Sequence, residues 1–122
     1  MPAIFIAESL ARALGQPIKV SRSGRVICGE GFQIDICAAK ISAIVKGEED
    51  ILSAMSALFG LPEKSRSHVF GVSEYVFSGT ILHPSPPNGK KFLWADAGNG
   101  WEEVRYIDPK ASIDSATILS AA

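Results

Sequence analysis

The sequence predicts an α+β domain with a mainly antiparallel sheet, built from a meander and a hairpin, and with two amphipathic helices. Residues 3–14 and 48–59 place apolar side chains three and four positions apart, which is the spacing of one helix face. Residues 17–45 and 91–107 instead alternate apolar and polar side chains between short turns, as antiparallel strands do. The chain has 122 residues, which fits a single domain.

We assign residues 1–107 to this α+β domain and residues 108–122 to a C-terminal tail or arm. The tail carries little charge and ends in the apolar run from Thr117 to Ala122. Chain termini fray unless they are tied down, so we expect an apolar tail of this kind to dock on the core or on a neighbouring chain.

Both predicted helices have clear stop signals. Gly15 and Pro17 end the first, and Gly60 and Pro62 end the second. Carboxylates in the first turn of the second helix favour the positive end of its dipole. The start of the first helix, residues 4–6, also fits a short strand. The apolar stripes consist of Ile6, Leu10, Ala13 and Leu14 in the first helix, and of Ile51, Leu52, Met55, Leu58 and Phe59 in the second.

The strands are predicted from period-two alternation and from glycine-containing turns. Residues 68–82 are apolar on both faces, which indicates a central or covered strand, with bends at Gly71 and Gly79. Tyr75, Phe77 and Ile81 would share one face of it. The meander consists of strands at 18–20, 25–28, 32–36 and 40–45, with turns at 21–24 and 29–31.

The segment 83–89 contains three prolines and predicts a stiff, extended loop that leads into a hairpin of residues 91–95 and 101–107. A type I′ turn at Asn99-Gly100 would place Trp94 opposite Arg105. Such a pair can gain about 0.5–1 kcal/mol from cation–π attraction.

Composition excludes several classes of function. The 12 basic and 13 acidic side chains give a net charge of −1, which argues against a dedicated nucleic-acid binder. The stretch from Arg12 to Arg25 carries a local charge of +4, which fits either phosphate contacts or a solvated strand edge. We expect no membrane span and no signal peptide, because no apolar run is long enough and the start carries no positive charge.

No metal site, cofactor or catalytic residue is expected. Cys28 and Cys37 are too far apart along the meander for a disulfide, and we expect both to be small buried hydrophobes. His68 and His83 lack ligand spacing. Asp96–Glu103 lacks calcium ligands at two required positions, and no serine lies in a nucleophile elbow. We therefore expect a non-enzymatic protein. The alternative of a catalytic site assembled from distant segments would require one of the histidines beside a nucleophile and a carboxylate.

Protein partners are expected instead. The mean hydropathy is positive, and excess apolar content in a small protein often lies in subunit contacts, so we expect a homo-oligomer. Trp and Tyr dominate binding hot spots, and the hairpin concentrates aromatic residues. The candidate interface residues are Trp94, Trp101, Arg105, Ile118 and Leu119.

The segments Gly71–Phe77, Pro84–Gly89 and Phe92–Trp94 resemble the strand, Pro/Gly loop and strand of small phage head–tail joining proteins. This resemblance covers about half of the chain, and the helix at 48–59 and the hairpin at 91–107 depart from it. It implies a non-enzymatic virion component that assembles into rings. The chain would then be located in the cytoplasm or the virion.

The order of elements also resembles small type III secretion chaperones, which are dimers that bind extended segments of other proteins. The chain differs from these chaperones in net charge, which is −1 here, whereas the chaperones are distinctly acidic. The alternative is therefore a dimeric secretion-type chaperone or an inhibitor of another protein.

Overall fold

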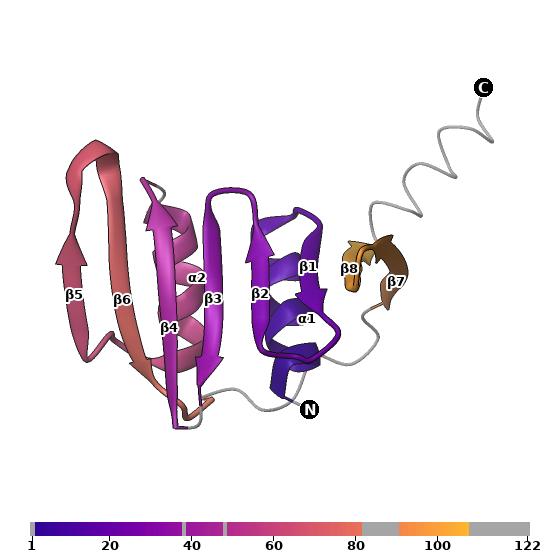
Figure 1. The fold of residues 1–122 in the computed structure, drawn as a ribbon, viewed down its shortest axis with the longest axis horizontal. Helices are drawn as coiled ribbons and strands as arrows, with labels where there is room; N and C mark the ends of the chain where they lie inside the picture. Colours follow the sequence, from indigo (N-terminus) through magenta and orange to yellow (C-terminus); the bar gives the residue numbers. More distant parts are fainter. Residues whose placement is uncertain (1, 38, 48, 82–90, 108–122) are drawn as a thin grey trace, which may run out of the picture.

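The computed structural model describes residues 2–37, 39–47, 49–81 and 91–107. Two helices pack on one face of an eight-stranded sheet in which every pair of neighbours is antiparallel, so the predicted α+β class is confirmed (Figure 1). The elements in chain order are α1 (Pro2–Leu14), β1 (Ile18–Ser21), β2 (Val26–Gly29), β3 (Phe32–Cys37), β4 (Lys40–Lys46), α2 (Glu49–Phe59), β5 (Lys64–Ser67), the short 3₁₀ helix η1 (Val69–Gly71), β6 (Val72–Ser78), β7 (Lys91–Gly98) and β8 (Trp101–Ile107).

The strands are arranged in the order β5-β6-β4-β3-β2-β1-β8-β7. The predicted meander forms β1 to β4, and the predicted strand within 68–82 forms β6 between β4 and β5. Alternation alone did not predict β5, because all four of its residues are polar or charged and exposed. Leu82, the loop 83–89 and the tail 108–122 lie outside the described residues.

Both helices end as predicted. The amide of Gly15 donates to the carbonyl of Ala11, and the amide of Gly60 donates to that of Ser56. Both glycines have positive φ, the left-handed conformation that terminates a helix without a Cβ penalty. Residues 4–6 belong to α1 and not to a strand.

The core lies between the helices and the sheet face that they cover. α1 contacts α2, β1, β2 and β8, and the side chains of Ile6 and Leu10 on this helix are fully buried. In Figure 1, β7 and β8 turn out of the plane of the other strands. Core positions on the strands include Ile18, Val20, Ile27, Phe32, Ile34, Ile41, Ala43, Val45, Phe77 and Val104.

The hairpin register differs from the prediction by one residue. The turn is as predicted, since Asn99 and Gly100 both have positive φ and Gly98 pairs with Trp101. A bulge between Asp96 and Gly98 then shifts β7, so that Trp94 lies opposite Val104 and not opposite Arg105. The predicted Trp–Arg pair is therefore wrong, because one extra residue moves each side chain of β7 to the other face.

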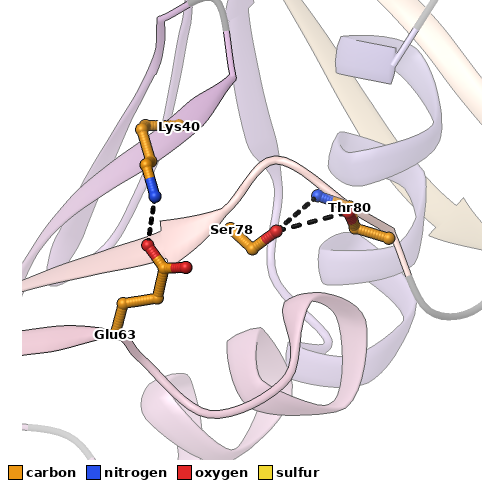
Figure 2. Close-up of polar contacts among 4 residues, drawn as sticks. All are labelled: Lys40, Glu63, Ser78 and Thr80. Atoms are coloured by element: carbon orange, nitrogen blue, oxygen red, sulfur yellow. Dashed lines mark hydrogen bonds and ion pairs between the residues drawn. The ribbon is translucent and has the colours of Figure 1, made fainter.

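Polar contacts fix the far end of β6 (Figure 2). The ammonium of Lys40, on β4, pairs with the carboxylate of Glu63 just before β5, so the pair crosses β6. The Ser78 hydroxyl accepts from the Thr80 amide at 3.3 Å and donates to its hydroxyl at 3.2 Å. Gly79, between Ser78 and Thr80 in the sequence, donates its amide to the carbonyl of Ala39 at 3.0 Å.

Gly79→Ala should destabilise the protein by about 1–3 kcal/mol, because the new Cβ needs backbone movement. That Cβ would lie 2.8 Å from the carbonyl oxygen of Ala39. Denaturant unfolding measures the effect, with Thr80→Ser as the control, because it keeps the hydroxyl that bonds to Ser78 at the exposed neighbouring position. Equal stability of the Gly79→Ala and wild-type proteins would show that the turn is not tightly packed.

Candidate protein-interaction surface

The sheet face opposite the helices is open. Burial alternates along the strands, and the side chains on this open face are charged, small or partly exposed and apolar. Ile44, on the interior strand β4, is 43% exposed, and Leu93, on the edge strand β7, is 57% exposed. Sheets with one covered and one solvated face usually alternate apolar and polar residues, so apolar side chains on the solvated face are candidates for contact with another protein.

The two tryptophans occupy different environments. Trp94 is half-buried on the helix side, where its indole Nε1 donates to Oε2 of Glu8 on α1 at 2.9 Å. Trp101 and Arg105 lie on the open side of β8, and the guanidinium of Arg105 pairs with Glu103 at 3.1 Å. Trp94 thus joins the hairpin to α1, and Trp101 and Arg105 remain partly accessible. Ile118 and Leu119 lie outside the described residues.

The two edges of the sheet differ in chemistry. At one edge, β5 is short and presents Lys64 and Arg66 on the open face, where charges discourage pairing with another strand. At the other edge, β7 runs for eight residues, with the apolar sequence from Phe92 to Ala95 in its middle. The side chains of this segment alternate between half-buried and exposed. Only the β7 edge therefore offers an apolar strand for pairing.

The exposed turn that contains Phe70 was not predicted from the sequence. Phe70, in η1, is 91% exposed and has φ 63° and ψ 28°. This left-handed conformation costs an ordinary L-residue about 1–2 kcal/mol. Gly71 next to it also has positive φ. The sequence around Phe70 is rich in valine and phenylalanine and thus has the composition of a buried strand, and only Gly71 indicated a bend.

The turn that carries Phe70 is held on both sides. The amide of His68 donates to the carbonyl of Val72 at 2.7 Å, which closes the turn. The His68 imidazole Nε2 lies 3.1 Å from Oε2 of Glu74 on β6. These contacts hold the backbone of the turn and leave the Phe70 ring exposed to solvent.

Phe70 stands beside a hollow of about 730 Å³ at the end of the molecule where β4 leads into α2. Its rim is fixed by Gln16, whose Oε1 accepts from the amide of Glu30 at 2.6 Å. The lining is mixed in charge and includes Glu30, Lys46, Asp50, Gly31, Gly47 and Gly71.

The cysteines are not paired with each other. Burial raises the pKa of the Cys28 thiol, and the Lys19 ammonium opposes that rise. The expectation of two buried cysteines is wrong, because Cys28 is only half-buried and Cys37 is exposed at the end of β3 on the open face.

The basic stretch does not form one surface. Arg12 lies on α1, behind the sheet, whereas Lys19 lies on the open face. β1 is flanked by β2 and β8, so the interpretation of this stretch as a strand edge is wrong. The hydrophobic pattern could not reveal this, because β8 comes from the far end of the chain.

Within residues 2–37, 39–47, 49–81 and 91–107, no three His, Cys, Asp or Glu side chains lie together as metal ligands. Asp96 instead accepts a hydrogen bond from the amide of Gly98 at 3.0 Å, inside the hairpin turn. In the same described residues, neither helix has the length and apolar character needed to cross a bilayer. His83 lies outside them.

Comparisons of the chain with models of protein families, with curated proteins and with solved structures gave no match.

The Trp94–Glu8 hydrogen bond should couple the hairpin to α1. In a double-mutant cycle of Trp94→Phe and Glu8→Ala, we expect a coupling energy of about 0.5–1.5 kcal/mol from denaturant unfolding. Additive effects of the two substitutions would show that the bond does not contribute to stability.

Phe70→Asn should stabilise the fold by about 0.5–1 kcal/mol, because asparagine adopts the left-handed conformation more easily and the lost ring is not packed. The melting temperature measures this effect. A clear decrease in melting temperature would mean that the Phe70 ring packs within the protein.

Proposed function

We propose that the protein is a non-enzymatic assembly protein that holds protein chains together, as a structural component at a phage head–tail junction would. The observation that carries the proposal is Phe70, an exposed aromatic side chain on a strained turn. The turn is also tied to β6 through His68, so the backbone that carries the ring has a defined position.

Folding of the single chain does not account for this arrangement. A strained backbone is normally offset by contacts that the same residue makes, and Phe70 makes few because 91% of it is exposed. Burial in a partner would recover about 2–3 kcal/mol from the ring, which exceeds the cost of the strain. An aromatic anchor is also the residue type that dominates binding hot spots.

The resemblance to head–tail joining proteins supports the same function from the sequence side. Those proteins act through contacts with neighbouring subunits and not through catalysis. The matched segment Gly71–Phe77 begins directly after Phe70, so the proposed anchor lies at the start of the stretch that carries the resemblance.

The expected result of a test is that Phe70→Asn reduces self-association. The mass in solution should be measured by light scattering over a tenfold dilution, for the wild-type and the variant proteins. We expect an oligomer of the wild-type chain and a smaller species for the variant, whose melting temperature is not lowered.

Leu61→Asn is the matched control, because Leu61 is 84% exposed and lies at the opposite end of β5 from Phe70. It should leave the mass unchanged. If both substitutions reduce the mass equally, general hydrophobic association explains the result. If neither does, Phe70 is not a subunit contact.

A dimeric chaperone or protein inhibitor is the second candidate, and the edge of β7, which has no second neighbour among the described strands, favours it. An extended segment of a client protein can add to such an edge as a further strand. In that case the protein would bind an extended apolar peptide, and a solution of the protein alone would not grow beyond a dimer.

A further inference from the structure

The middle of the edge strand β7, ahead of the bulge between Asp96 and Gly98, lacks the features that prevent strand pairing. It is eight residues long and pairs only with β8, so its other side is unpartnered within the described sheet. Edge strands are usually protected by being short or by lysine and arginine in their middle. In β7 the middle of the strand is instead Phe92-Leu93-Trp94-Ala95.

The opposite edge strand, β5, has the protective features that the middle of β7 lacks. β5 is half as long and carries both Lys64 and Arg66, and all of its residues are exposed. A head-to-tail contact between β5 of one copy and β7 of the next would place these cations opposite Leu93 or Ala95 on the open face. A contact of β7 with itself avoids that mismatch.

We propose that two copies of the chain pair β7 with β7 in antiparallel orientation about a two-fold axis at Leu93. The inference deepens the proposed function, on which it rests, because it names a second copy as the partner. The two sheets would continue into one another, with both pairs of helices on the same side and both open faces on the other.

The sequence of β7 selects this register. Residues directly opposite in an antiparallel pair point to the same face, so the axis must pass through a residue and not between two. With the axis at Leu93, the two Leu93 side chains meet on the open face. On the helix side, Phe92 of each copy lies opposite Trp94 of the other, and aromatic cross-strand pairs stabilise sheets.

Neighbouring registers are less favourable. An axis at Phe92 would place Leu93 opposite Lys91, and an axis at Trp94 would place Phe92 opposite Asp96. An axis at Ala95 would place Trp94 opposite Asp96. The bulge between Asp96 and Gly98 interrupts the strand beyond that point, so pairing centred further along would be short.

Leu93→Lys tests the contact, because it places two like charges opposite each other at the axis. We expect the dimer dissociation constant to rise by about tenfold or more, measured by sedimentation or light scattering, with the separated monomer still folded. Ile44→Lys is the matched control on the same open face but in the interior strand β4, and it should leave the constant unchanged. Unchanged association of Leu93→Lys would overturn the proposal.

Cysteine crosslinking tests the register. In a Cys28→Ser, Cys37→Ser background, Leu93→Cys should form an intermolecular disulfide with itself, since directly opposite Cβ atoms, about 4.5–5.5 Å apart, need only a small closing movement to reach the roughly 3.5–4.5 Å that a disulfide spans. Ala95→Cys alone should not, but its mixture with Lys91→Cys should. Crosslinking of Ala95→Cys with itself, or none at any position, would contradict the pairing.

The failure of this proposal is distinguishable from failure of the proposed function. If Phe70→Asn reduces the mass but Leu93→Lys does not, the protein assembles without the β7 contact and the inference is wrong. A monomeric wild-type chain overturns both. If both contacts operate, each single variant should give a smaller species and the double variant a monomer.

Discussion

The enclosure of α1 determines the shape of the molecule. Its apolar face is buried by β1, β2, β8 and α2 together, and the small residues Ala3, Ala7 and Ala11 let these elements approach closely. To cover α1, the last hairpin must leave the plane of the sheet and pack its side chains of Val104 and Trp94 toward the helix. This brings the end of the domain beside β1 and leaves β7 as the outermost strand, so the edge proposed for assembly follows from the burial of α1.

The same arrangement concentrates the helices on one side and leaves the open face, the β7 edge and the Phe70 turn uncovered within the described residues. The β7 edge and the Phe70 turn lie on different elements, so the two proposed contacts can form at the same time. A two-fold contact at β7 closes on itself and stops at a dimer, whereas growth into a larger particle needs a second contact. The Phe70 turn is at the other half of the sheet, between β5 and β6, where it would serve that purpose.

The sequence was sufficient for the elements whose periodicity is strong. The two helices, the four-strand meander and the Asn99-Gly100 turn were predicted because each has a local pattern of apolar residues and turn residues. The rest depends on interactions that such patterns do not contain. The bulge after Asp96 reverses the faces of β7, β5 has no apolar residue to reveal it, and the pairing of β8 with β1 joins distant segments. Of the candidate interface residues, Trp101 and Arg105 lie on the open side of the hairpin, whereas the ring of Trp94 contacts α1. The exposure of Phe70 was not predicted, because it depends on a backbone conformation that composition does not show.

The most direct measurement is amide hydrogen exchange along β7 and β5 at a high and a low protein concentration. If β7 pairs with a second copy, its outward amides are protected at high concentration and lose protection on dilution, whereas those of β5 exchange fast at both. Fast exchange along β7 at every concentration, matching that of β5, would contradict the claim that β7 is the contact edge.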